Sequence, residues 1–201
     1  LKASLAADAL GRAGACRREI DFALAREQLA GRVVEGLARG TLPERIVHND
    51  TKFNNVRFDR RTHAAICLVD LDTVMPGSVL YDFGDLVRTT VNPAAEDAAD
   101  LRQAVCRMDM FQALCRGYLG VAGYFLTQNE TVLLADAGPL ITLELGIRFL
   151  SDYLDGDRYF KTGHETHNLM RCRTQFHLVA EMERRADEMA GIVERSLKSA
   201  R

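Results

Sequence analysis

One polar loop of the sequence gathers side chains that suit the transfer of a phosphoryl group. It begins at His48 and contains the carboxylate of Asp50, the ammonium group of Lys52 and the side-chain amide of Asn55. Phosphoryl transfer needs an acceptor hydroxyl that is oriented and deprotonated, which a carboxylate at a loop tip can do. A nearby lysine balances charge on the transferred group, and an amide oxygen can hold a hard cation such as Mg²⁺. We therefore expect Asp50 and Lys52 to be catalytic and Asn55 to be a metal ligand.

A second polar segment, which contains Asp70 and Asp72, follows an apolar run. The residues between the two loops predict strands over 56–58 and 65–69, joined by a polar turn. Such a hairpin returns the chain to its starting point, so we expect Asp70 to lie beside Asn55 as the principal metal ligand. Three interpretations of Asp72 remain open: a second metal ligand, a group that binds a sugar hydroxyl, or a structural hydrogen-bond acceptor.

Two further residues are expected to support this site. We interpret His48 as a buried residue whose ring bonds the backbone of the next loop. Asp82 begins a D-F-G triplet, but it lies too far along the chain for one hairpin and opens a helical pattern. We assign Asp82 a structural task, which is to accept backbone N–H bonds near a helix start and so hold the catalytic loop.

The elements that must position these loops are mainly helical. Thr127 and Glu130 form a capping-box pattern at a helix start, and residues 155–157 are typical of a turn. The predicted fold is mainly α (α+β), with a short extended run at 45–47 and one small β-hairpin that carries the two loops. Helices are expected over residues 17–39, 80–90, 96–107, 109–126, 128–137, 139–154 and 168–197.

Composition excludes several classes of protein. The chain has 201 residues, of which 47% are hydrophobic, and a net charge of −2. These values suit one globular domain and exclude a disordered or fibrous chain. They give no support for a nucleic-acid or membrane partner, and no apolar run reaches the roughly 18 residues of a membrane span. The five scattered cysteines include no C-x-x-C pair, which predicts reduced thiols in a cytoplasmic protein. Nothing indicates the oligomeric state.

The loops also resemble those of a known superfamily. HNDTKFNNVRFD, followed by ICLVDLDTVMPGSVLYDFGDLVRT, resembles the aminoglycoside phosphotransferase and choline kinase superfamily of small-molecule kinases, and H-x-D-x-x-x-x-N is the spacing of a kinase catalytic loop. Within that superfamily the chain is most similar to bacterial N-acetylhexosamine 1-kinases, through HNDTK.NN, VDLDTVMPG, YDFGD, ELGIRFLSDYLDGDRYF and HNLMRCRTQ. The resemblance covers most of residues 17–180. Much of the superfamily has Gly-Asp where this chain has Asn49-Asp50, a departure that favours the hexosamine-kinase group.

The resemblance assigns functions to individual residues. It implies that Asp50 is the catalytic base, that Asn55 and Asp70 bind Mg²⁺, and that ATP is the co-substrate. It also implies that Arg148, in LGIRFL, contacts a sugar. Without the resemblance, a surface ion pair is the usual fate of a helical arginine. The implied reaction is phosphorylation of a sugar hydroxyl, namely the anomeric hydroxyl of an N-acetylhexosamine such as N-acetylglucosamine or N-acetylgalactosamine.

A kinase of this kind also needs an N-terminal lobe with a phosphate-covering loop and a strand lysine. The sequence contains no G-x-G, and Lys2 is the one lysine ahead of the catalytic loop. We therefore expect residues 1–201 to form the C-terminal lobe of a protein-kinase-like fold, with the nucleotide lobe absent from this chain and the chain alone inactive.

Other functions were weighed against this one. Aminoglycosides, choline and homoserine are acceptors of the same superfamily. Choline would call for an aromatic cage, which the lack of tryptophan and the 7% aromatic content disfavour. A non-catalytic binding module derived from the superfamily is the remaining alternative, but the intact Asp50, Asn55 and Asp70 count against it.

Overall fold

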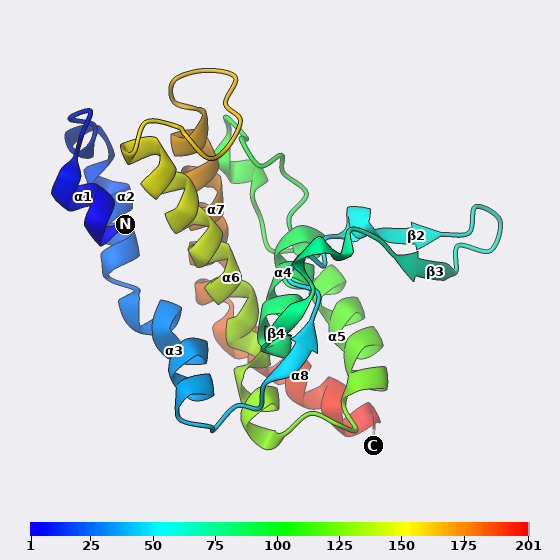
Figure 1. Ribbon diagram of the computed structural model, residues 1–201. Coiled ribbons are helices and arrows are strands. Elements are labelled where there is room, and N and C mark those ends of the chain that lie inside the picture. The colour runs from blue at the N-terminus through cyan, green and yellow to red at the C-terminus, as the bar shows by residue number, and fades with distance from the viewer. Residues whose placement is uncertain (201) are drawn as a thin grey trace.

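The computed structural model describes residues 1–200, and in it a long helix runs through the centre of a helical body from which a hairpin projects (Figure 1). The central helix α6 packs most extensively against α7 and α4, and it also contacts α1, α2, α3 and α8. The helices are α1 (Lys2–Ala7), α2 (Arg17–Leu24), α3 (Glu27–Ala38), α4 (Val79–Val91), α5 (Met108–Ala122), α6 (Gln128–Leu154), α7 (His167–Arg184) and α8 (Ala186–Ala200).

The strands form two small antiparallel sheets. The predicted hairpin is confirmed as β2 (Val56–Phe58) and β3 (Ala65–Leu68). A second sheet, which the sequence did not predict, pairs β1 (Arg45–Val47) with β4 (Met75–Gly77). Strand β4 contains a proline and a glycine, both depleted in strands, and a two-stranded sheet tolerates them because each strand has a free edge. The predicted class, mainly helical with a little β structure, is confirmed and is consistent with the helical lobe of a kinase-like fold.

Several helix boundaries differ from prediction. The helix expected over 17–39 is interrupted at residues 25–26, and the one expected over 168–197 is interrupted at Arg185. The break expected between 137 and 139 does not occur, because α6 continues through Pro139. A proline inside a helix forfeits one backbone hydrogen bond, at a cost of about 3 kcal/mol, and the burial of this stretch against α4 and α7 offsets it. The capping box of Thr127 and Glu130 is confirmed.

The helix predicted over 96–107 is wrong. In that region the structure has only a short 3₁₀ turn, Leu101–Gln103. The segment is rich in helix-forming residues, but its acids bond to another element instead. Glu96 pairs with Arg171, and Asp97 contacts His167 on α7. Tertiary contacts therefore outweigh local helix propensity in this segment.

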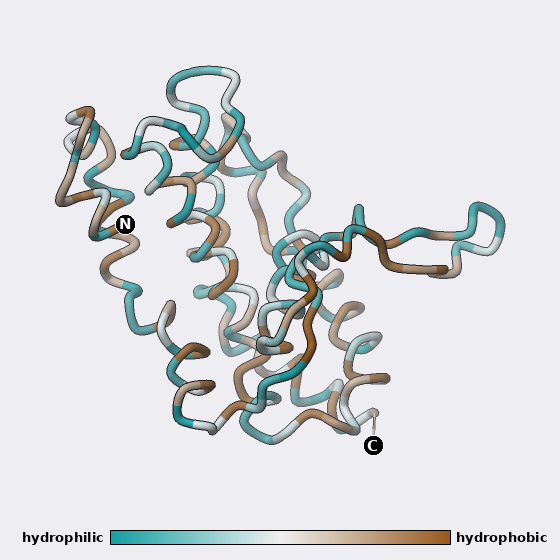
Figure 2. The backbone as a smooth tube through the Cα atoms, viewed as in Figure 1, coloured by the Kyte–Doolittle hydropathy of each residue, from teal (hydrophilic) through white to brown (hydrophobic). Residues whose placement is uncertain are grey.

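Two glycines let α4 lie unusually close to α6. A Cβ atom on Gly84 would come within 2.4 Å of the carbonyl oxygen of Ala137, and one on Gly138 within 2.6 Å of Val87. The side chains of Leu80, Phe83 and Val87 are fully buried along this contact. The close packing makes α4 and α6 one rigid support, and both contribute to the site described below. Figure 2 shows that the projecting strand β3, by contrast, is apolar along its length.

None of the helices in the described part of the chain has the length and apolar character needed to cross a lipid bilayer.

Candidate active site

The polar loop that follows β1 is fastened to α4 by one aspartate. The two carboxylate oxygens of Asp82 accept hydrogen bonds from the backbone N–H groups of His48, at 2.9 Å, and Asn49, at 2.7 Å. The hydroxyl of Thr51 donates to the backbone carbonyl of Asp82 at 2.7 Å. The sequence analysis expected the Asp82 carboxylate to accept backbone N–H bonds, as it does from His48 and Asn49. They fix the loop on both sides of Asp50 to the first turns of α4.

A second set of hydrogen bonds joins this loop to the end of the hairpin. The ring Nε2 of the buried His48 donates to the carbonyl of Val69 at 3.2 Å, the contact that the sequence predicted for it. The backbone N–H of Val69 donates to the carbonyl of Asn55 at 2.9 Å. The hydroxyl of Thr73 donates to the carbonyl of His48 at 2.6 Å. The two loops at the ends of the hairpin are therefore held side by side.

Asp50 uses one carboxylate oxygen for the loop and leaves the other free. Its Oδ2 accepts from the ammonium of Lys52 at 2.7 Å and from the side-chain amide of Asn55 at 2.9 Å. Its Oδ1 has no hydrogen bond to any residue among 1–200. The hydrogen bond to Asp50 is the main reason that the pKa of Lys52 is raised, and the charges of Asp50, Asp70 and Asp85 add to it although partial burial acts the other way. Lys52 therefore remains a cation beside the free oxygen.

The backbone turns sharply at both loops. Asn49, immediately before Asp50, has φ 61°, and Asp70 has φ 64°. Glycine takes this left-handed region without strain, and Asn and Asp are the other residues that accept it most readily. The side-chain amide of Asn49 donates to the carbonyl of Thr73 at 3.1 Å, which helps to hold its turn. An asparagine at residue 49 therefore suits the backbone conformation of the loop.

The residues expected to bind metal lie next to each other in the structure. Asp70 directly follows Val69, which is bonded to the backbone of Asn55. The Asn55 amide N–H₂ is used by Asp50, so its Oδ1 is left over, and the exposed Asp70 carboxylate has no hydrogen bond or ion pair within residues 1–200. One amide and one carboxylate oxygen without protein partners suit a hard divalent cation. No group of three or more His, Cys, Asp or Glu residues that could hold a metal occurs in the part of the chain described.

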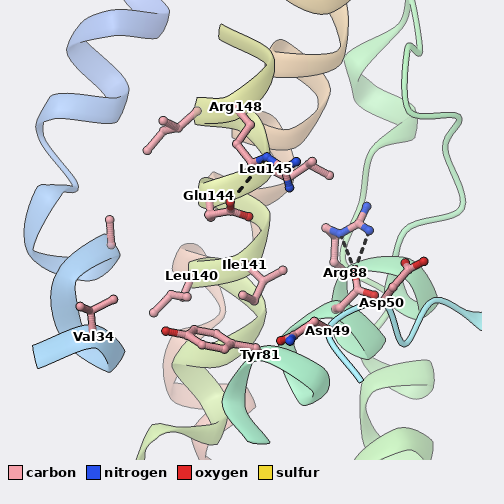
Figure 3. Close-up of a pocket in the computed structure, with 13 residues that line it drawn as sticks. Val34, Asn49, Asp50, Tyr81, Arg88, Leu140, Ile141, Glu144, Leu145 and Arg148 are labelled. Carbon is pink, nitrogen blue, oxygen red and sulfur yellow. Dashed lines mark hydrogen bonds and ion pairs between the residues drawn. The ribbon is translucent and has the colours of Figure 1, made fainter. Parts of the chain in front are cut away.

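A pocket of about 620 Å³ opens beside the loop. Figure 3 shows Asn49 and Asp50 at one side of it, Val34 at the other, and side chains of α6 between them. Asp50 and Arg148 both line this pocket, although they lie far apart in the sequence. The residues lining the pocket are Ala30, Val34, Asn49, Asp50, Tyr81, Asp85, Arg88, Leu140, Ile141, Glu144, Leu145, Ile147 and Arg148.

Arg148 is held at the pocket wall by weak contacts. Its guanidinium lies 3.8 Å from the carboxylate of Glu144 and 3.3 Å from the hydroxyl of Tyr159. Loss of hydration raises the pKa of Glu144, and the nearby charges of Arg148 and Arg88 only partly reverse that effect. Long contacts of this kind leave the N–H groups of Arg148 available for a bound molecule.

The lining of the pocket lacks one of the residues selected from the sequence and includes two that were not selected. Asp72 lies exposed in a short 3₁₀ turn, Leu71–Thr73, and does not line the pocket, so its contact with metal or acceptor stays a prediction. The sequence analysis did not select the pair Asp85 and Arg88, whose side chains do line it. Asp85 lies one helical turn after Asp82, and that spacing was the available signal, since residues three apart share a helix face.

Comparison with known protein families identifies one family that the chain matches. The model of the phosphotransferase enzyme family APH matches residues 2–124, which is more than half of the chain. The match includes Asp50, Lys52, Asn55, Asp70 and Asp82 and ends before Arg148. The chain therefore belongs to the APH phosphotransferase enzyme family.

Proposed function

We propose that this protein transfers the terminal phosphoryl group of ATP to a sugar hydroxyl, with the anomeric hydroxyl of an N-acetylhexosamine as the acceptor. The observation that carries the proposal is the position of Asp50. One oxygen of this carboxylate is held by Lys52 and Asn55, while the other is free, and the residue lines a pocket that also contains Arg148. Membership of the phosphotransferase family supports the type of reaction.

The proposed reaction moves one proton and one phosphoryl group. The acceptor hydroxyl binds in the pocket and gives its proton to Oδ1 of Asp50 as its oxygen forms a bond to the γ-phosphorus of ATP. The bond from that phosphorus to the bridging oxygen breaks, and ADP leaves. Lys52 stays protonated because its ammonium is bonded to Asp50, so it offsets negative charge beside the reacting groups. Arg148 would bind the acceptor at the far wall.

Magnesium and ATP complete the proposal. The residues that would hold Mg²⁺ are Asn55 and Asp70, whose oxygens have no other partner within residues 1–200. A magnesium ion bound there would neutralise the phosphates of the nucleotide. The chain contributes the fixed spacing of the two ligands, since the bond between Val69 and Asn55 ties their backbones together. A cytoplasmic location, where ATP is available, is supported by five cysteines that are all free in the described residues.

The charges in and beside the pocket favour a neutral polyol over the other acceptors of the family. Its three carboxylates each face a cation: Asp50 faces Lys52, Asp85 faces Arg88, and Glu144 faces Arg148. A polycationic aminoglycoside would find no surplus of negative charge here. Tyr81 is the one aromatic side chain in the lining, so the pocket offers no aromatic cage for a quaternary amine such as choline.

We also propose that residues 1–201 are the C-terminal lobe and that a nucleotide lobe covers the hairpin. The support is a set of large apolar side chains that face solvent in the two small sheets and in the turn after the hairpin: Ile46 is 73% exposed, Ile66 64% and Leu71 58%. Exposed apolar surface of this extent is typical of an interface. We expect no measurable turnover from the 201-residue chain alone. A robust ATP-dependent rate from the purified chain would contradict this proposal.

The test of the function is Asp50→Asn in the enzyme that carries both lobes. Asparagine keeps the hydrogen-bond geometry but cannot accept the proton, so we expect kcat to fall by about 10²–10⁴-fold. The assay couples ADP release to a panel of sugars that includes N-acetylglucosamine and N-acetylgalactosamine.

The matched control for this test is Asp136→Asn. Asp136 is likewise an aspartate in an ion pair, here with Arg32, but it is partly exposed on α6 and does not line the pocket. We expect this variant to keep the parent rate. An Asp50→Asn enzyme that retained a tenth of the parent rate would refute the function of Asp50 as the base.

A further inference from the structure

A second buried carboxylate, Asp85, forms part of the pocket wall beside Asp50. It is 7% exposed and lies on α4 one turn after Asp82, the residue that fastens the catalytic loop. The next residue toward the N-terminus is Gly84, where α4 and α6 touch. The position of Asp85 relative to Asp50 is therefore set by packed backbone and by two short hydrogen bonds.

The hydrogen bonds of Asp85 are one-sided. Arg88 directs both Nε, at 3.1 Å, and Nη2, at 2.6 Å, to the same oxygen of Asp85, Oδ1. Arginine and carboxylate commonly pair as a fork, with each N–H on a different oxygen. Here Oδ2 is buried and has no hydrogen-bond partner among the described residues. Buried polar atoms are nearly always paired, so one left over in a pocket wall calls for a partner.

We propose that Asp85 is a further acceptor-binding residue, whose free oxygen accepts a hydrogen bond from a hydroxyl group of the sugar in the pocket. The inference rests on the proposed function. Arg88 anchors the carboxylate through Oδ1. Oδ2 is covered in the structure, so the contact requires a rotation about the Cβ–Cγ bond, which is a soft torsion; that rotation also moves Oδ1, and the flexible Arg88 side chain follows it.

The surroundings of Arg88 argue against a purely structural pair. Arg88 lines the acceptor pocket and also a neighbouring cavity of about 420 Å³, which Lys52 lines as well. Arg88 thus lies between the two spaces, and its partner Asp85 lines the first of them. With Asp50 Oδ1, Asp85 supplies the second uncommitted carboxylate oxygen on this side of the pocket. Two such acceptors suit a ligand with several hydroxyl groups.

The experiment compares Asp85→Asn with Asp136→Asn in the enzyme that carries both lobes. The amide oxygen of asparagine can still accept from Arg88, while its N–H₂ replaces the free oxygen. We expect the KM for the sugar to rise about tenfold or more, the scale of one lost hydrogen bond to a charged group. A structural role alone would not separate the substrates, so the KM for ATP should stay within about twofold of the parent.

Deoxy analogues of the accepted sugar identify the partner hydroxyl. The analogue that lacks it should lose affinity with the parent enzyme but lose little more with Asp85→Asn, which is the non-additivity expected of two groups in contact. If Asp85→Asn lowers the unfolding temperature by more than a few degrees, Asp85→Glu replaces it. Glutamate keeps the charge but displaces the oxygen, and the same rise in sugar KM is expected.

The outcomes separate this inference from the proposed function. The inference alone would be overturned by the following combination of results. The parent enzyme phosphorylates a sugar, the Asp50→Asn variant is inactive, and the Asp85→Asn variant has the same KM for the sugar as the parent. Additive losses across every deoxy analogue would also overturn it. A parent that phosphorylates no member of the panel, with or without Asp50, would overturn both.

Discussion

The two halves of the candidate site rest on very different supports. The pocket is lined largely from α4 and α6, where Leu80, Phe83 and Val87 are fully buried and a glycine brings the backbones together. The proposed metal ligands sit at the ends of the hairpin, and every residue of β3 is exposed. The helical half is complete in itself, whereas the hairpin half presents apolar side chains to water.

The two halves of the candidate site therefore differ in how rigidly their residues are held. The pocket side is held at fixed geometry by a packed core, which suits recognition of one shape of ligand. The hairpin side leaves apolar side chains exposed to solvent. Changes in the two regions should therefore have very different effects on stability, and the following experiments test that contrast.

The largest loss of stability should come from Glu130→Ala, which breaks the connection between the helical body and the first sheet. Glu130 is fully buried, caps the start of α6, and pairs with Arg45 of β1 at 2.7 and 2.9 Å. Removing one partner of a buried ion pair leaves the other uncompensated and costs about 3–5 kcal/mol. Chemical denaturation measures the loss, and an unchanged midpoint would contradict it.

The same residue predicts a pH dependence. Burial would raise the pKa of Glu130, but the bonds from Arg45 and Thr127 outweigh it, and the net pKa is lowered. A lowered pKa in the folded state means that this stabilisation is complete above the ordinary pKa of glutamate. It is lost as the pH falls through the folded value. The parent should therefore lose more stability than Glu130→Gln between neutral and acid pH, and equal slopes would contradict this.

A pair of leucines tests the contrast directly. Leu80→Ala on α4 removes a fully buried side chain and should cost about 2–5 kcal/mol. Leu68→Ala on β3 removes one that is 50% exposed and should change stability by less than about 0.5 kcal/mol. Thermal unfolding of both variants measures the difference. Similar losses would show that the hairpin is part of the core in solution.

The smallest effect concerns the thiols. Burial raises the pKa of Cys106 to about 11 and that of Cys115 to about 12, and it raises that of Cys172 well above the usual value. Cys67 on β3 is the exposed one. Since the thiolate is the reactive form, alkylation at pH 8 should modify Cys67 first, with Cys67→Ser as the control. Rapid labelling of several cysteines in the native protein would contradict this assignment.

The parts of the fold that depend on short-range signals could be predicted from the sequence. The hairpin follows from two apolar runs around a polar turn, and the start of α6 follows from the capping box. Asp82 was separated from the expected metal ligands by its distance along the chain and by the helical pattern that it opens. The two loops were also expected to lie together, and the hydrogen bonds of His48 and Val69 hold them side by side.

The parts that depend on contacts between distant elements could not be predicted. The segment 96–107 has helix-forming residues, yet its acids bond to α7. Pro139 is a helix breaker in isolation, and only packing retains it inside α6. Asp85 was missed because its importance lies in an oxygen that Arg88 leaves unpaired, a feature of three-dimensional geometry.

The attachment of the catalytic loop to α4 has a mechanical consequence. Because Asp82 holds the backbone N–H groups of His48 and Asn49, a substitution that changes how α4 packs on α6 would shift the loop as well. Substitutions deep in that helix contact, remote from the pocket, would then move the Asp50 carboxylate. The geometry of the loop is in this way set from the interior of the helical body, with the residues that line the pocket left unchanged.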